Sequence, residues 1–198
     1  MGKFAFPPTQ AVPAFSNTFP HIFEDDNVPC LIPAAIDQDP YFRMTRDVAQ
    51  KLKYNKPASI YASFFPAMQG FKTKMSSSSA TSAVLVTDTP KMVKEKINKH
   101  CKSGGQETAE LQRELGADLE ADVPYQYLRF FMEDDAQYEE IGRKYAKGEL
   151  MTGEVKAILI EELQKFLKDF QAKRAKVTDE DVRKFKSVRK INPYPEAW

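Results

Sequence analysis

Short apolar runs alternate with polar turns in the first third of the chain. Cys30 to Ile36 (CLIPAAI) is an apolar run that ends at three polar residues, 37–39, and a helical pattern follows through 41–52. A second run at 58–63 (ASIYAS) has the composition of a strand. The order strand, helix, strand predicts an α/β unit with a parallel sheet whose first strand is buried.

From Thr87 onward the spacing of apolar residues is helical. Val93, Ile97 and Cys101 recur every four positions, with charged residues between them. Start signals and apolar stripes predict four further helices. Asp122 and Pro124 begin one before YQYLRFFM, and Tyr138, Ile141 and Tyr145 form the stripe of the next. Thr152 precedes a helix with a stripe from Val155 to Phe170, and a capping box at Thr178 and Asp181 begins the last. Amphipathic segments of this kind, joined by short turns, predict a helical bundle. We therefore expect an α/β part at 1–86 and an all-α part at 87–198.

Composition narrows the class of protein. Hydrophobic residues are 42% and charged residues 29%, which is typical of a globular chain. Lys and Arg number 29 against 28 Asp and Glu, so the net charge of +1 gives no overall attraction to nucleic acid and any such binding needs a local patch. The two cysteines lack CxxC spacing, which indicates a reducing compartment and offers no zinc site. No apolar run has the length of a membrane span.

The stretch KMSSSSATSAV, 74–84, is the first candidate for chemistry. Small residues, hydroxyl groups and one cation, Lys74, are what a phosphate-binding loop needs, although serine-rich stretches are also common linkers. Asp37 and Gln38 follow the first predicted strand, and ligands of parallel sheets bind at the carboxyl ends of strands. A ligand site near 37–38, with the serine loop beyond the second strand, is therefore expected.

These segments carry a resemblance. KMSSS at 74–78 resembles the KMSKS signature of class I aminoacyl-tRNA synthetases. LIPAAIDQDPYFRMTRDVA and FPPTQAVPAFSNTFPHIF resemble amino-acid-site segments of tryptophanyl-tRNA synthetases of the eukaryotic cytosolic and archaeal type. TDTPKMVKEKINKHCKSGG, YLRFFMEDD and the segment after Leu150 resemble the C-terminal helical domain of that family, so the resemblance covers nearly the whole chain.

The resemblance implies a fold and an activity. The fold is the C-terminal part of a Rossmann-type catalytic domain followed by a helical anticodon-binding domain. The activity is activation of tryptophan with Mg²⁺·ATP to tryptophanyl-adenylate, then transfer to tRNA(Trp). It also implies a cytoplasmic protein that acts as a homodimer.

The resemblance further assigns residue roles. Lys74 neutralises charge on the phosphates as the catalytic residue, and Met75, Ser76 and Ser78 bind ATP with it. The tryptophan site takes Gln10, Asp37 and Gln38, and tRNA contacts fall to Arg43, Glu107 and Lys156. No metal ligand is implied, because Mg²⁺ arrives with the nucleotide.

The chain departs from the family pattern in three ways, the first of which is Ala34 in place of a cysteine. Ser77 replaces the second lysine of KMSKS, and no HIGH-type ATP motif or indole-reading tyrosine and glutamate is found. We therefore expect a C-terminal half that does not form the adenylate alone. The alternative function is a non-catalytic tRNA-binding or protein-interaction module built on the helical part.

Each assigned residue also has an ordinary structural explanation. Gln10 and Gln38 can cap turns, Arg43 can pair with a local acid, and Lys74 and Lys156 can be surface lysines. Acids favour a helix N-terminus, which applies to Glu107 and to the triplet 133–135, for which a metal site is the second possibility. Aromatic residues fill helical cores, and this is expected of Tyr125, Tyr127, Phe130 and Phe131.

Overall fold

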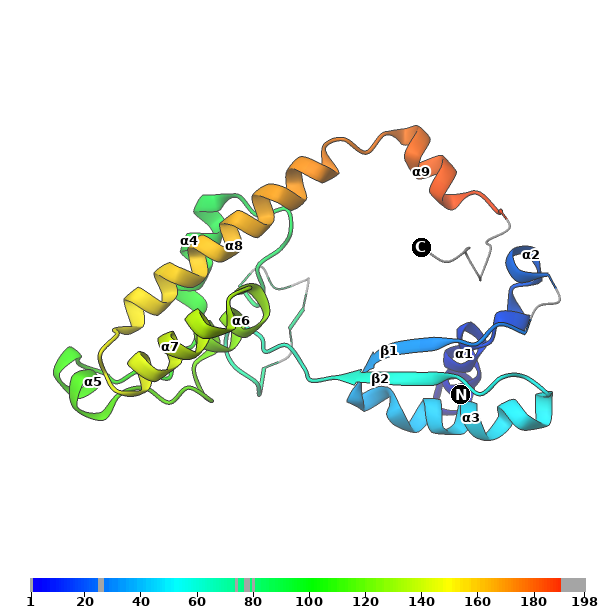
Figure 1. The fold of residues 1–198 in the computed structure, drawn as a ribbon, viewed down its shortest axis with the longest axis horizontal. Coiled ribbons are helices and arrows are strands. Elements are labelled where there is room, and N and C mark those ends of the chain that lie inside the picture. Colours follow the sequence, from blue (N-terminus) through cyan, green and yellow to red (C-terminus); the bar gives the residue numbers. More distant parts are fainter. Residues whose placement is uncertain (1, 25–26, 74, 77–78, 80, 190–198) are drawn as a thin grey trace. The chain divides into compact units, whose positions relative to one another are not determined.

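The computed structural model describes residues 2–24, 27–73, 75–76, 79 and 81–189 (Figure 1). It contains two compact units. Residues up to Phe64, together with the segment from Thr178, form the first, and Phe65–Val177 form the second. Met68 lies in the hydrophobic core of the second unit, and Phe65 packs against that core. The domains expected at 1–86 and 87–198 stay a prediction.

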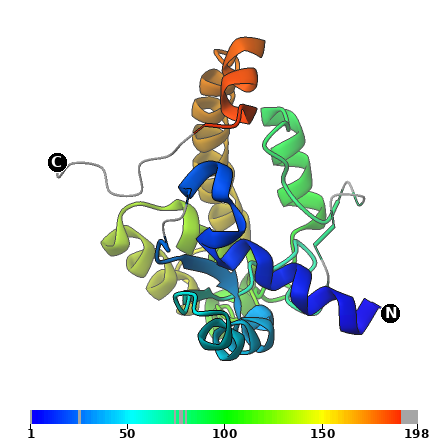
Figure 2. The ribbon, with the colours of Figure 1, turned by 90° about the vertical axis from the view of Figure 1, so that its right-hand side faces the viewer.

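The first unit holds a two-stranded parallel sheet. Strand β1 (Leu31–Ala35) pairs with β2 (Ala58–Ala62), with Leu31 opposite Ala58. Helix α3 (Asp39–Leu52) connects them and lies along one face of the sheet (Figures 1 and 2). The predicted strand–helix–strand order and parallel pairing are confirmed.

The predicted burial of the first strand is wrong. No residue of β1 is buried, and Leu31 is 59% exposed; Ile60 of the second strand is 57% exposed. The sheet has two strands among the described residues, so each strand has an unpaired edge. Parallel sheets are usually covered on both faces by helices, which makes this exposure unusual.

The remaining elements of the first unit are short. They are α1 (Gly2–Ala11), η1 (Val12–Ala14), η2 (Ser16–Thr18), α2 (Pro20–Phe23), η3 (Ile36–Gln38) and α9 (Asp179–Lys186). Phe15 and Ala49 are buried and bring α3 against the segment after α1. The predicted capping box of α9 is confirmed, since the Asp181 N–H donates to Thr178 Oγ1 at 3.2 Å and the Thr178 N–H to Asp181 Oδ2 at 2.9 Å.

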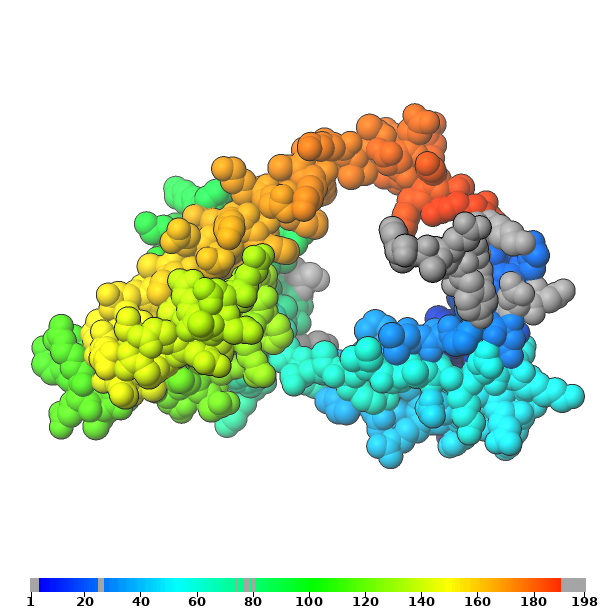
Figure 3. Space-filling model, viewed as in Figure 1, coloured from blue at the N-terminus to red at the C-terminus, as the bar shows by residue number. Residues whose placement is uncertain are grey.

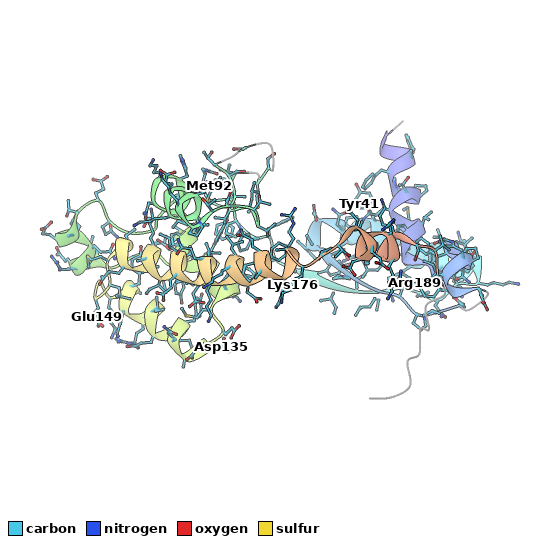
Figure 4. The ribbon with its side chains drawn as sticks, turned by 90° about the horizontal axis from the view of Figure 1, so that it is seen from above. Tyr41, Met92, Asp135, Glu149, Lys176 and Arg189 are labelled. Atoms are coloured by element: carbon cyan, nitrogen blue, oxygen red, sulfur yellow. The ribbon has the colours of Figure 1, made fainter. Side chains whose placement is uncertain are left out.

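The second unit is helical. Its helices are α4 (Pro90–His100), α5 (Ala109–Leu115), α6 (Val123–Phe131), α7 (Asp135–Ala146) and α8 (Thr152–Arg174). Figure 4 shows α4, marked by Met92, and α7, marked by Asp135, on opposite sides of α8. Figure 3 shows α7 against the first half of α8. No helix in the described part of the chain is both long and apolar enough to cross a membrane.

The core of this unit follows the predicted stripes, with three exceptions. Buried residues from four helices meet in it, namely Val93, Ile97, Tyr125, Tyr127, Leu128, Ile141, Tyr145, Val155, Leu159, Leu163 and Leu167. Phe166 and Phe170 were expected on the buried side of α8 but are 48% and 36% exposed. Phe130, expected in the core, is 55% exposed.

Polar residues begin two of these helices as expected. Asp122 accepts a hydrogen bond from the Tyr125 N–H at 2.8 Å, and Asp134 accepts one from the Gln137 N–H at 3.0 Å. Both carboxylates are N-caps. The helix-start interpretation of the acidic triplet is thereby confirmed.

Candidate functional site

Two residues assigned to the tryptophan site contact each other. Gln10 lies in the last turn of α1, and Gln38 ends η3 just past the carboxyl end of β1. The Gln10 Nε2 atom donates to Gln38 Oε1 at 3.3 Å. Twenty-eight residues separate them, so the fold rather than local turn geometry joins the two amides.

Acidic residues flank Gln38 in the sequence. Asp37 is exposed at the same end of β1, and Asp39 begins α3. Arg43 Nε lies 2.5 Å from Asp39 Oδ2, so Arg43 does pair with a local acid. A hydrogen bond from Tyr61, and then the pairing with Arg43, hold the pKa of Asp39 below its ordinary value.

The serine loop is described in part. Lys74, Ser77 and Ser78 lie outside the described residues. Met75 is half-buried and lines an apolar cavity of about 100 Å³ with Tyr127 and Leu163 of the helical core. The Met75 side chain therefore brings this loop onto the helical unit.

Ser82 closes the loop upon itself. Its buried hydroxyl donates to the carbonyl oxygen of Ser76 at 2.7 Å or Ser79 at 3.0 Å. The Ser82 Oγ atom also accepts a hydrogen bond from the Ser76 N–H at 3.2 Å. The Ser82 side chain thus holds both the N–H and the carbonyl group of Ser76. Ser76 is a residue that the family resemblance assigns to ATP binding.

A buried ion pair, which sequence reasoning missed, holds the exit of the loop. Lys96 Nζ lies 2.6 Å from Asp88 Oδ2 and donates to the Ala83 carbonyl at 3.1 Å. Asp88 Oδ2 also accepts the Leu85 N–H at 2.8 Å. The available signal was the position of Lys96, three residues after buried Val93 and next to buried Ile97 in the apolar stripe of α4.

Two of the candidate tRNA-contacting residues, Glu107 and Lys156, lie on the helical unit. Glu107 is exposed and precedes Thr108, the N-cap of α5, so it is outside the helix. Its carboxylate makes no hydrogen bond or ion pair with the residues that the structure describes. Lys156, in the second turn of α8, is half-buried and donates from Nζ to the Asn98 carbonyl at 3.3 Å, near the C-terminal end of α4.

Comparison with known proteins supplies the family. The model of the family described as tRNA synthetases class I (W and Y) matches residues 19–168. The chain belongs to this family. That match covers β1, β2, the serine loop and most of the helical unit.

Relatives in this family are identical to the chain at about half of the aligned positions. The chain is 53% identical over 197 residues to a protein of Dictyostelium discoideum named tryptophan–tRNA ligase, cytoplasmic, covering 97% of this chain and 49% of that protein. It is 54% identical over 192 residues to the Arabidopsis thaliana protein of the same name, covering 96% and 48%.

A solved structure agrees in fold. The crystal structure of Plasmodium falciparum tryptophanyl-tRNA synthetase superposes with a TM-score of 0.81 at 44% identity, covering 94% of this chain and 49% of that one. The chain thus spans about half the length of the curated relatives that it matches.

Proposed function

We propose that this chain supplies part of a tryptophan–tRNA ligase of the class I family. Its first unit belongs to a Rossmann-type catalytic domain, and its helical unit binds the anticodon. The observation that carries the proposal is the amide pair of Gln10 and Gln38 at the carboxyl end of β1, in a chain whose relatives bear that enzyme name. A cytoplasmic location accords with the names of the same relatives.

The amide pair has the groups that a zwitterionic amino acid needs. A glutamine side chain carries two donors and one acceptor. The hydrogen bond between them uses one Gln10 donor and one lone pair of Gln38, so carbonyl oxygens remain for an ammonium group and N–H donors for a carboxylate. Asp37 adds a negative charge beside them, which favours the ammonium group of tryptophan.

The serine loop serves the nucleotide in this proposal. Lys74, Met75, Ser76 and Ser78 hold the phosphates of Mg²⁺·ATP, and Lys74 neutralises charge as tryptophan attacks the α-phosphate. A carboxylate oxygen of tryptophan forms a bond to the α-phosphorus of ATP. The bond from that phosphorus to the oxygen bridging to the β-phosphate breaks, and pyrophosphate leaves. Ser82 and the Lys96–Asp88 pair support this role by fixing the backbone on the far side of the loop.

The helical unit serves tRNA(Trp). The exposed carboxylate of Glu107 suits the exocyclic amine of cytosine, the first base of the CCA anticodon. Lys156 uses one of its three ammonium donors on Asn98, which leaves two for a phosphate or a base carbonyl. Arg43 contacts the acceptor end of tRNA(Trp). The enzyme acts as a homodimer, as its family does.

The test is tryptophan-dependent ATP–pyrophosphate exchange. We expect none from the chain alone, because catalysis by positioning needs the segment with the HIGH-type motif. Exchange should appear when the preceding half of a relative is supplied on a second polypeptide or by fusion. In that reconstituted enzyme Lys74→Ala should lower the rate by about 100-fold or more. Exchange that never appears in the reconstituted enzyme, or that is unaffected by Gln38→Ala, contradicts the proposal.

A further inference from the structure

A buried carboxylate stands behind the turn that carries Glu107. Asp122 is fully buried, and its Oδ1 atom caps α6. Its Oδ2 atom accepts from the Gly104 N–H at 2.8 Å, from the Ser103 hydroxyl at 3.1 Å and from the Tyr145 hydroxyl at 2.8 Å. Asp122 has no ion pair with the described residues, so these hydrogen bonds are the interactions that stabilise its buried carboxylate.

Three hydroxyl groups extend this cluster to the start of α8. Tyr145 OH lies 3.0 Å from Thr152 Oγ1 and 3.2 Å from Ser103 Oγ, and Ser103 Oγ lies 3.3 Å from Thr152 Oγ1. Each hydroxyl has a single proton, so the contacts are mutually dependent. We call Ser103, Asp122, Tyr145 and Thr152 the hydroxyl cluster.

Backbone groups of the turn are fixed by the same cluster. The Gly105 N–H donates to Ser103 Oγ at 2.9 Å. A Cβ atom at Gly105 would lie 2.2 Å from Thr152 Oγ1, so the glycine lets the turn approach α8 closely. The next residue is fixed from α5, because the Gln106 N–H donates to Gln112 Oε1 at 2.8 Å.

Glu107 follows directly on this fixed stretch, whereas Lys156 lies one helical turn after Thr152. Residues four apart share a face of a helix. The hydroxyl cluster therefore joins the turn of one candidate RNA-reading residue to the helix that carries the other. A hydrogen bond weakens steeply with small displacements, so reading a base edge with one carboxylate requires such a fixed distance.

We propose that the hydroxyl cluster positions Glu107 relative to Lys156 and thereby sets the preference for cytosine as the first anticodon base. The inference rests on the proposed function of the helical unit. The four residues are positioning residues, since they act through the turn and do not touch the RNA.

The test compares two buried tyrosines in the full chain. Tyr145→Phe removes the hydroxyl of the cluster and keeps the ring. Tyr127→Phe is the matched control, because its buried hydroxyl donates to the Pro66 carbonyl at 2.7 Å, outside the cluster. Binding is measured for two anticodon stem-loop RNAs, one with CCA and one with uridine in place of the first cytosine.

We expect Tyr145→Phe to lower the ratio of the two dissociation constants by about fivefold or more, with the salt dependence of binding unchanged. Tyr127→Phe should leave the ratio unchanged. Ser103→Ala provides a second variant if Tyr145→Phe does not fold. Thr152→Ser, which keeps the hydroxyl, should retain a preference that Thr152→Val loses.

The outcomes separate the two proposals. A wild-type chain that binds both RNAs equally overturns the anticodon-binding function and the inference with it. A wild-type preference that survives loss of the cluster hydroxyls overturns the inference alone. The same holds for a preference that Tyr127→Phe reduces as much as Tyr145→Phe does.

Discussion

Lys96 and Asp88 form an ion pair that is almost entirely withdrawn from water. The Lys96 side chain is 10% exposed and that of Asp88 is 1% exposed. Breaking a buried pair from one side leaves a charge without a partner, and this costs more than the intact pair contributes. The pair also holds two backbone groups between the serine loop and α4.

We therefore expect Asp88→Asn to lower the free energy of unfolding by about 3–5 kcal/mol. The exposed pair of Lys99 and Glu95, at 3.6 Å on the same helix, provides the control, and Glu95→Gln should cost less than about 1 kcal/mol. Urea unfolding monitored by circular dichroism measures both. Equal effects of the two substitutions would show that burial of the Lys96 pair has no special weight.

Cys101 gives the helical unit a dependence on alkaline pH. Burial raises the pKa of its thiol from the ordinary 9.0 to about 12, although the charge of Lys156 opposes the shift. The unfolded chain releases this proton near pH 9, whereas the folded chain keeps it up to about pH 12. The stabilising contribution of the thiol is therefore complete below pH 9 and is lost as pH rises toward 12.

Cys101→Ala should flatten the decline of unfolding free energy above pH 9 by about 1.4 kcal/mol per pH unit. Denaturant titrations at several alkaline pH values measure the slope, which is unaffected by the cost of the substitution at neutral pH. Cys30→Ala, at a less buried thiol, should change the slope less. An unchanged slope in Cys101→Ala would mean that the thiol ionises without unfolding.

At the scale of elements, the helices are far better supported than the sheet. Two parallel strands with exposed Leu31 and Ile60 bury little apolar surface, and isolated pairs of strands are marginal in water. Helix α8 instead buries four residues, Val155, Leu159, Leu163 and Leu167, against its neighbours.

We expect backbone amides of β1 and β2 to exchange with deuterium much faster than those of α6 and α8. Supplying the preceding half of a relative should slow exchange in the strands and leave the helices unchanged, because added strands would pair the free edges of β1 and β2. Hydrogen exchange followed by mass spectrometry resolves the segments. Protection of the strands equal to that of α8 in the chain alone would contradict this expectation.

Periodicity predicted most of these elements, because the start of a helix or strand depends on residues close together in the sequence. Helix α3, both strands and the caps at Asp122, Asp134 and Thr178 were all predicted. Helix α1 was missed, since it contains Pro7 and Pro8, which argue against a helix. The solvent exposure of β1 and of the Phe166 side chain was not predicted, because burial depends on which other elements pack against a strand or helix.

The candidate site divides in the same way. The position of Gln38 after a strand was predicted from pattern, but its bond to Gln10 joins residues 28 apart and no spacing rule specifies it. Asp122 was recognised as a helix start, whereas its bonds to Gly104 and Tyr145 depend on the tertiary fold.

At the scale of the whole molecule, the near balance of charge makes any RNA binding a local matter. A net charge of +1 attracts a polyanion weakly. Basic residues nevertheless occur on α4 and α8, including Lys94, Lys99 and Lys156. Binding that depends on such residues should weaken steeply with added salt, because phosphate contacts release counterions.

Lys156→Ala should weaken binding of both anticodon stem-loops similarly and reduce the salt slope by about one if its contact is to a phosphate. Lys173→Ala, whose ammonium group lies 2.7 Å from Asp169 near the far end of α8, provides the control and should leave the slope unchanged. A salt series of binding titrations measures both. If both substitutions have the same effect on the slope, Lys156 has no particular role.

The close approach at Gly105 has a consequence for genetics. The three heavy atoms nearest to a Cβ atom there are side-chain oxygens, those of Thr152, Gln112 and Ser103, and the backbone of Gly105 is not left-handed. An alanine at 105 should therefore have second-site suppressors of its folding defect, with Thr152→Gly the first to emerge from a selection for folded chain. Because Thr152→Gly also removes a hydroxyl of the cluster, the suppressed chain should fold without regaining the anticodon preference. At Gly116, φ is +69° and a Cβ atom would lie 1.8 Å from the main-chain oxygen of Ala146. No side-chain change removes that oxygen, so only reversion to glycine should restore an allele altered at 116.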